Sequence, residues 1–303
     1  MNATPVLVGY TTVVGFVAPA LLLRARWPYR APALAAAVWH ALVVSFTVGA
    51  MLSVYNVVMP TEQLHVGLLG LLHSCGLDIG MSSPVPQGAG RLAVALPAVI
   101  GAAVTSSFLF HVVRARRLRT RHREAVDLVG RRSVRLGATI LPYDTPAAYC
   151  LPGRRPRIVI SDAAVRELTS AQLAAVLEHE QAHIAGRHHL ALAAVEAFHS
   201  VFRRLPLARH AREQMTLLLE MVADDRALRG HSRETLATAM YEMAATRRPE
   251  GAFAAGGHTV VIRLERVLGP RQAPHPLFWG CVAACAVAVP LLPLLLACPP
   301  GLG

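Results

Sequence analysis

Two histidines and a glutamate stand close together in the chain as His179-Glu180-Gln181-Ala182-His183. Residues four apart lie on the same face of a helix, so both imidazoles can bind one metal ion with Glu180 beside them. Imidazole nitrogens are ligands of zinc, and a neighbouring carboxylate can act as a general base. The spacing therefore predicts a zinc site that activates water for hydrolysis.

A hydrolytic zinc site takes a third protein ligand and keeps one position open for water. His189 is one candidate, because it completes His-x-x-x-His-x-x-Gly-x-x-His through Gly186. Glu220 is the other, and Asp224 follows it by one helical turn, where a carboxylate can orient a ligating imidazole. The helix-like run after His189 favours Glu220. If Glu220 is the third ligand, we expect His188 and His189 to be exposed polar residues after a helix end.

The motif must be held by a helix, and the sequence predicts one over residues 169–186. Thr169 and Gln172 form a capping box at its start, and Gly186 suits its C-terminal end. Apolar residues recur at helical spacing and predict a buried stripe, comprising Leu173, Val176, Leu177 and Ile184.

The stretch before this helix is the only one that resembles β-structure. Val134–Leu141 and Ala148–Leu151 alternate loosely, prolines separate the stretches, and Arg157–Ser161 has the clearest strand pattern. The sequence thus predicts a small sheet placed directly before the helix that carries the two histidines.

The composition indicates a membrane protein. The chain has 303 residues, 54% of them hydrophobic and only 16% charged. Its formal net charge is +12, and all 30 of its basic residues are arginine. Such a charge raises nucleic acid as a partner, but no recognition-helix or base-stacking pattern accompanies it, so we expect no direct contact with nucleic acid. Four apolar runs free of Asp, Glu and Arg predict transmembrane helices: Val6–Leu23, Ala33–Met59, Leu92–Val113 and Leu277–Cys298.

Arginines follow the first and the third of these runs, six of them between Arg114 and Arg123. The positive-inside rule places both clusters in the cytoplasm, and the second can also bind anionic membrane lipid. Both termini and the Leu64–Cys75 stretch then lie outside, where Cys75 and Cys298 could pair. We expect a multi-pass protein of the cell membrane with a membrane region over residues 1–113, a cytoplasmic domain over 114–276, a fourth span and an outer tail over 299–303.

The sequence resembles a known family at several places. Leu177-Glu178-His179-Glu180-Gln181-Ala182-His183, followed by Glu220-x-x-x-Asp224-x-x-Ala227, resembles the BlaR/MecR family of membrane metallopeptidases and its HtpX-type relatives. Ile158–Ser161, Leu168–Leu173 and Arg263–Leu268 look similar too, and the order of the spans matches BlaR/MecR. Those antibiotic sensors carry a penicillin-binding domain after the last helix, which we expect to be absent here.

The resemblance implies a mainly α fold: four transmembrane helices, with a cytoplasmic α+β gluzincin-like zinc peptidase domain inserted between the third and the fourth. It implies one Zn2+ per chain, held by His179, His183 and Glu220. Glu180 would be the catalytic base, and Asp224 would orient a ligand.

Relatives pair an edge strand with the backbone of the substrate, which here implies Tyr149, Cys150 and Leu151. The donor that stabilises the transition-state oxyanion is harder to assign. His231 is a candidate for that catalytic role, and its alternative is a loop residue just before the Ser232 helix cap.

Three functions remain open at this point. The first is signalling by cleavage of a cytoplasmic protein such as a BlaI/MecI-like winged-helix repressor. The second is quality control of membrane proteins, as in HtpX. The third is a non-enzymatic signal transducer, which Glu180 disfavours, because a purely structural zinc site needs no general base. The sequence leaves the inducing signal and the oligomeric state open.

Overall fold

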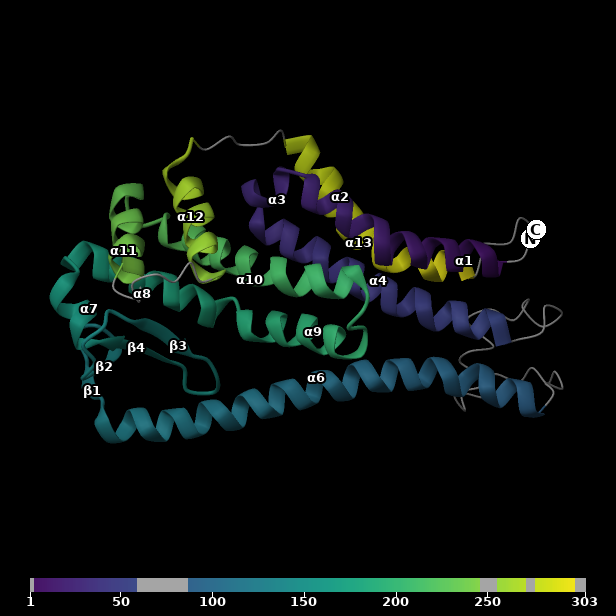
Figure 1. Ribbon diagram of the computed structural model, residues 1–303, viewed down its shortest axis with the longest axis horizontal. Coiled ribbons are helices and arrows are strands. Elements are labelled where there is room, and N and C mark those ends of the chain that lie inside the picture. The colour runs from purple at the N-terminus through teal and green to yellow at the C-terminus, as the bar shows by residue number, and fades with distance from the viewer. Residues whose placement is uncertain (1–2, 59–86, 246–254, 271–275, 298–303) are drawn as a thin grey trace.

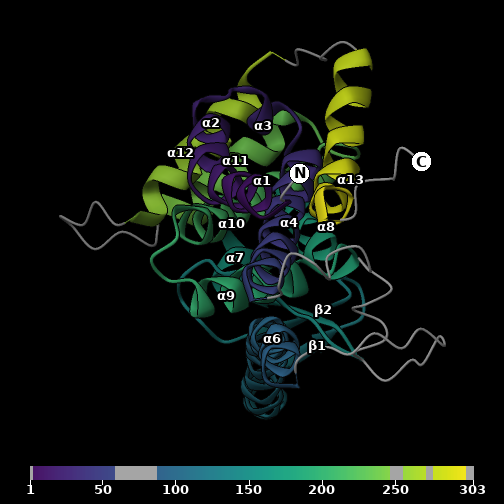
Figure 2. The ribbon, with the colours of Figure 1, turned by 90° about the vertical axis from the view of Figure 1, so that its right-hand side faces the viewer.

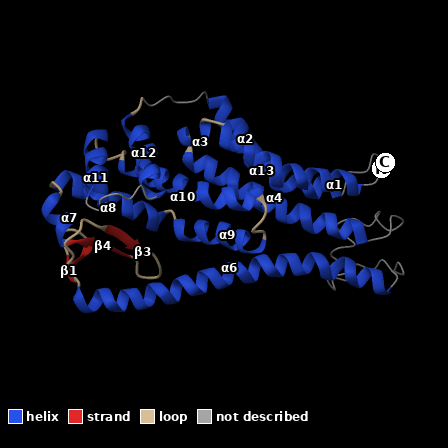
Figure 3. Ribbon diagram, in the orientation of Figure 1, coloured by secondary structure: helices blue, strands red, loops and turns tan. Residues whose placement is uncertain are grey.

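The structure is a computed structural model that describes residues 3–58, 87–245, 255–270 and 276–297 (Figure 1). It is mostly helical with one small sheet near one end (Figure 3), which confirms the mainly α prediction. The Leu64–Cys75 stretch and both members of the suggested Cys75–Cys298 pair lie outside the described residues.

Within the described residues, four helical segments are long and apolar enough to cross a membrane: Thr4–Arg24, Pro32–Val58, Arg91–Val129 and Pro276–Ala297. Each overlaps one of the predicted runs. The first segment consists of α1 (Ala3–Thr12), a π-helical turn (Val13–Val17) and α2 (Ala18–Arg24). The other three are α4 (Pro32–Val58), α6 (Gln87–Val129) and α13 (Pro276–Ala297). A short helix, α3 (Trp27–Arg30), precedes α4. The start of α1 and the end of α13 lie at the end of the molecule opposite the sheet (Figure 1).

Helix α6 continues well beyond the predicted end of the third span. The sequence has no proline or glycine between Val113 and Val129, so nothing interrupts the helix before Gly130, whose N–H donates to the Val126 carbonyl at 2.8 Å. The arginine run therefore lies on the same rigid helix as the third span, and this helix reaches the sheet (Figure 1).

The sheet has four strands: β1 (Arg131–Ser133), β2 (Ala138–Leu141), β3 (Ala148–Leu151) and β4 (Arg157–Ser161). Their order is β1-β2-β4-β3, with β2 and β4 parallel and the other pairs antiparallel, so β3 is an edge strand. The expectation of one strand over Val134–Leu141 was wrong in its first half. Residues 134–137 turn the chain instead, and Gly137 has a φ of +61°, which a glycine adopts without strain.

Between the sheet and α13, the described residues form six helices: α7 (Asp162–Glu167), α8 (Ser170–Ala185), α9 (His188–Val201), α10 (Pro206–Ala227), α11 (Arg233–Ala245) and α12 (Ala255–Leu268). The predicted capping box of α8 is present. The Thr169 hydroxyl accepts a hydrogen bond from the Gln172 N–H, and the Gln172 side chain accepts one from the Thr169 N–H at 2.8 Å. Both bonds satisfy N–H groups that a helix start otherwise leaves unpaired.

The largest hydrophobic core joins the membrane helices to the segment that follows α6. Trp39 and Phe46 of α4 pack with Phe198 of α9 and with Met215 and Leu218 of α10. Two polar contacts strengthen the junction: His40 Nε2 lies 3.3 Å from the Ala191 carbonyl, and His111 Nε2 lies 2.9 Å from Ser200 Oγ. Helices α9 and α10 therefore pack beside α4 and α6 (Figures 1 and 2) rather than in a separate unit.

A candidate metal centre between two helices

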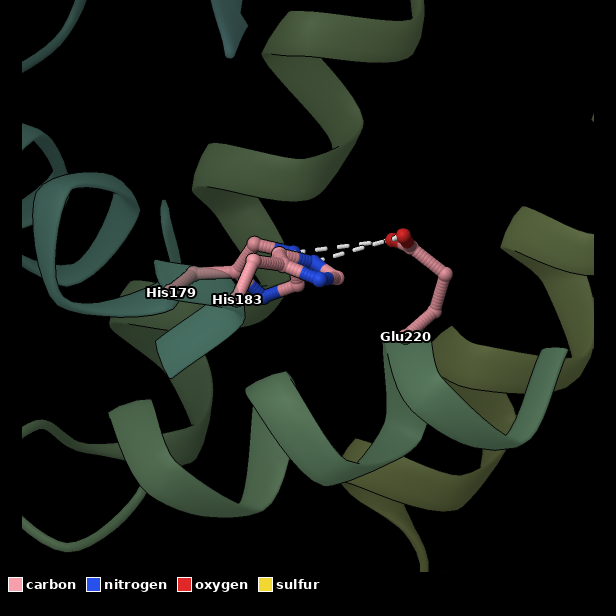
Figure 4. Close-up of side chains that lie close together, drawn as sticks. All are labelled: His179, His183 and Glu220. Carbon is pink, nitrogen blue, oxygen red and sulfur yellow. Dashed lines mark hydrogen bonds and ion pairs between the residues drawn. The ribbon is translucent and has the colours of Figure 1, made fainter. Parts of the chain in front are cut away.

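Helices α8 and α10 bring three possible metal ligands together. His179 and His183 lie one turn apart on α8, and Glu220 faces them from α10 (Figure 4). One ligand atom from each residue lies within 4.8 Å of the other two. Among the described residues, this is the group of histidine, cysteine and acidic side chains that could hold a metal ion.

The spacing of these atoms fits zinc. The Nε2 atoms of His179 and His183 are 3.2 Å apart, and they lie 3.5 and 3.4 Å from the nearer oxygens of Glu220. Ligand atoms around a tetrahedral zinc with bonds of about 2.0–2.2 Å are separated by roughly 3.3–3.6 Å. Two imidazoles and one carboxylate are also a donor set typical of catalytic zinc. The three residues therefore fit a zinc ion by chemistry and by spacing.

Asp224 supports the site from behind. Its side chain is fully buried, and its Oδ1 lies 3.0 Å from Nδ1 of His179, on the ring edge opposite the ligand atom. A carboxylate in this place fixes the imidazole orientation and keeps the proton on Nδ1. The structure thus places Asp224 beside His179, and its role in orienting that ligand stays a prediction.

Arg263 of α12 completes the buried charge cluster, although no local motif had assigned it to the site. Its guanidinium donates to both oxygens of Asp224, at 2.7 and 2.8 Å, and to Glu220 Oε2 at 2.7 Å. The arginine side chain is 12% exposed. The similarity of Arg263–Leu268 to the relatives was the signal that could have identified it. The contact itself depends on how α12 packs against α10.

The charges in the cluster shift the pKa values of its members in opposite directions. Burial lowers the pKa of His179, but the Asp224 and Glu220 carboxylates outweigh it and raise this pKa to about 9. Burial lowers the pKa of His183 to about 4. Burial also opposes ionisation of Glu220 and Asp224, but their bonds to His179 and Arg263 hold both pKa values at about 2.

Glu180 lies beside the ligands but forms no part of their group. Burial raises the pKa of its carboxyl, with a further increase from nearby Glu220 and opposing effects from His179. The thiol of Cys150, on β3, is close enough to Glu180 for this carboxylate, together with burial, to raise the Cys150 pKa to about 12. A carboxyl with a raised pKa next to a metal site suits a general base.

Strand β3 presents backbone groups next to Glu180. The Ser161 N–H donates to the Ala147 carbonyl at 2.8 Å, and the register pairs Tyr149 with Val159. Hydrogen-bonded residues alternate along an antiparallel strand. Tyr149 and Leu151 therefore bond to β4, whereas the N–H and C=O groups of Cys150 point to the opposite edge. Of the three residues predicted for substrate pairing, Cys150 has the suitable backbone direction.

Two other predicted residues fall outside the ligand group. His189 does not join it, although its ring is partly buried. His231 follows α10, and no interaction described for it reaches the three ligands, so its catalytic role stays a prediction.

The prediction that His188 is an exposed residue after a helix end was wrong. The side chain is 5% exposed, and its Nδ1 lies 2.8 Å from Nδ1 of His183. The turn that ends α8 folds it back over the site, which helical spacing alone does not reveal.

Comparison with known proteins places this site in a family context. Residues 113–250 match the family model of peptidase family M48, whose members are zinc-dependent proteases. No curated protein and no solved structure matches the chain. The matched segment contains all three candidate ligands together with Glu180 and Asp224. With the four apolar helices, this similarity supports a membrane protease in general.

Proposed function

We propose that the chain is an integral membrane zinc endopeptidase whose active site faces the cytoplasm. The observation that carries this proposal is the near-tetrahedral spacing of His179, His183 and Glu220 beside the buried carboxyl of Glu180. A structural zinc site has four protein ligands and needs no acid or base. The described group offers three ligands and a non-ligating carboxyl, which favours catalysis.

The chemistry is hydrolysis of a peptide bond. Zinc held by the three ligands would supply Lewis acidity to the scissile carbonyl and lower the pKa of a water molecule to about 7. Glu180 accepts a proton from the attacking water as its oxygen adds to the carbonyl carbon. The same carboxyl then donates that proton to the amine nitrogen as the C–N bond breaks. Its raised pKa favours return of the proton to the leaving nitrogen.

The substrate backbone would pair with the open edge of β3. Its N–H and C=O groups at Cys150 point away from β4, and Glu180 is near enough to affect the pKa of the Cys150 thiol, so a peptide on this edge lies near the base. Addition of a strand to a sheet edge binds a peptide through backbone bonds and is tolerant of sequence. This mode supports an endopeptidase acting on an extended segment.

The placement of the active site on the cytoplasmic side rests on the distribution of arginine charges. The arginine run of α6 follows directly on its apolar part, within one uninterrupted helix, and the sheet lies at the end of that helix. We propose that the substrate is a cytoplasmic winged-helix repressor of the BlaI/MecI kind and that its cleavage is a signalling event. The support for this step is the resemblance of the motifs and of the span order to the BlaR/MecR family.

Glu180→Gln tests the enzyme. The purified variant in nanodiscs should bind one zinc per chain, as the unmodified protein does, and should cleave a winged-helix repressor at least about 100-fold more slowly. Glu178→Gln is the matched control on the same helix, because Glu178 pairs with Arg226 at the surface. Full activity of the Glu180 variant would contradict the proposal.

The pattern of products separates the alternatives. One defined cut in one repressor supports signalling. Cleavage of many misfolded membrane proteins would favour quality control. Zinc binding without any cleavage, by the unmodified protein and by the variant alike, would indicate a transducer.

A further inference from the structure

We propose that His188 is a positioning residue that fixes the tautomer and orientation of the zinc ligand His183. This inference rests on the metal centre proposed above and adds a residue that lies outside its ligand group. The contact comes from the first residue of α9, on the far side of the turn that ends α8.

The two rings meet through the nitrogens that face away from the ligand group. Nδ1 of His188 lies 2.8 Å from Nδ1 of His183, and the ring centroids are 4.7 Å apart with planes at 89°. The other nitrogen of His183, Nε2, is the atom that faces His179 and Glu220. The bond to His188 therefore engages His183 at the nitrogen that metal binding leaves free.

A hydrogen bond between two imidazole nitrogens needs one donor and one acceptor. If His183 donates from Nδ1, its Nε2 carries a lone pair and can bind a metal. If His188 donates instead, the proton of neutral His183 moves to Nε2 and blocks the ligand atom. In the metal-binding state His188 is consequently the acceptor, and its own proton sits on Nε2.

The arrangement gives each zinc histidine its own partner from a different helix. Asp224 of α10 holds Nδ1 of His179 at 3.0 Å, and His188 of α9 holds Nδ1 of His183 at 2.8 Å. Partners of this kind orient metal ligands, and their loss typically weakens metal binding.

The backbone between α8 and α9 is shaped to allow the contact. A Cβ atom on Gly186 would lie 2.5 Å from Nε2 and 2.6 Å from Cδ2 of the His188 ring, so only glycine leaves room for the ring there. Arg187 has a φ of 49°, in the left-handed region that non-glycine residues seldom adopt, and this residue reverses the chain. Gly186 itself has a φ of −76°, which alanine adopts freely, so the ring is the main obstacle to a methyl group, and the Ala182 carbonyl oxygen would lie 3.2 Å from it.

Two variants of equal shape test the proposal. His188→Asn places its Oδ1 acceptor where Nδ1 now lies, whereas His188→Leu has the same branching without an acceptor. Zinc dissociation constants are measured by chelator competition on the full chain in nanodiscs. We expect His188→Leu to weaken zinc binding about 10–100-fold and His188→Asn to stay within about threefold of the unmodified chain. His189→Leu is the neighbouring control and should bind zinc normally.

Gly186→Ala tests the same contact from the backbone. The methyl group should displace the ring and weaken zinc binding about as much as His188→Leu does, again about 10-fold or more. Gly186→Ala and His188→Leu break the same contact between His188 and His183. The double variant should therefore lose little more zinc affinity than either single variant, whereas independent effects would multiply. The melting temperatures of the zinc-free variants, followed by circular dichroism, show whether any loss of affinity reflects misfolding.

The outcomes distinguish the role of His188 from the existence of the metal centre. Equal zinc affinities for His188→Leu, His188→Asn and the unmodified chain would overturn the role of His188 and leave the proposed enzyme intact. Equal losses in the Asn and Leu variants would also overturn it, because shape and not the acceptor would then matter. An unmodified chain that binds no zinc would overturn the metal centre and this inference together.

Discussion

Removal of the Arg263 guanidinium should destabilise the zinc-free protein more than the loss of any surface ion pair. Arg263 forms three hydrogen bonds of 2.7–2.8 Å to Asp224 and Glu220. The carboxylate of Asp224 is fully buried, and without the arginine it retains only His179 as a partner among its described contacts. Arg263→Met keeps the apolar stem and removes the charge, so the change isolates the electrostatic contribution.

Breaking a buried ion pair from one side costs about 3–5 kcal/mol, because a charge is left in a poorly solvated place. For a domain of this size, each kcal/mol lowers the melting temperature by roughly 2–4 °C, so we expect a decrease of about 6–20 °C. Part of the loss should be recovered when Asp224 is made neutral. The double variant Asp224→Asn with Arg263→Met should therefore be more stable than the sum of the two single effects predicts.

The assay is thermal unfolding in detergent micelles, followed by circular dichroism, with and without zinc. Zinc should reduce the loss, because it adds positive charge beside Glu220 and stabilises the folded state by binding to it. Arg226→Met is the matched control. Arg226 pairs with Glu178 at the surface, where such a pair contributes about 0–1 kcal/mol. If Arg263→Met costs no more than this control, or if the double variant is strictly additive, the reasoning is refuted.

Four further outcomes are expected. Zinc affinity should rise about tenfold per pH unit from pH 6.5 to 9, because zinc displaces the proton that His179 holds with a pKa of about 9; calorimetry in two buffers should detect about one proton released at pH 7.5, and the absence of release would contradict this. In the zinc-free protein, the stabilisation from protonated His179 should be complete below its unfolded pKa of about 6.5 and lost as the pH rises through 9. Glu220→Ala should lose zinc stoichiometry while His189→Ala keeps it, and the reverse result would restore His189 as the ligand. Thr169→Ala should cost about 1 kcal/mol in denaturant unfolding without changing zinc affinity, because it removes only the capping box of α8.

Local patterns in the sequence were enough to predict the main helices and the pairing of the two histidines. The four apolar runs overlap four helices that could span a membrane, since a long uncharged stretch is itself the physical requirement for such a helix. The start of α8 followed from Thr169 and Gln172, whose bonds form within one turn. The placement of His179 and His183 on one helix face followed from helical periodicity, which does not depend on tertiary contacts.

Contacts between distant elements were harder to predict. The sequence could rank Glu220 above His189 only by the helix-like run that follows, and it was the packing of α10 against α8 that brought Glu220 within 3.5 Å of both imidazoles. The same packing buries Asp224 and admits Arg263 from α12. The separation of these residues along the chain carries no information about their distance in space.

The sequence by itself determined which reactive groups stand close together: a pair of histidines that could bind zinc with a glutamate beside them, on a capped helix, in a chain with four apolar runs. Only the tertiary structure decided which groups surround that pair. In the tertiary structure His188 contacts His183 instead of lying at the surface as expected, and α9 and α10 pack into the core of the membrane helices. The physical reason is the range of the interactions. Periodicity and capping act within a few residues, whereas the partners of a buried imidazole depend on turns such as that at Gly186 and on how whole helices pack.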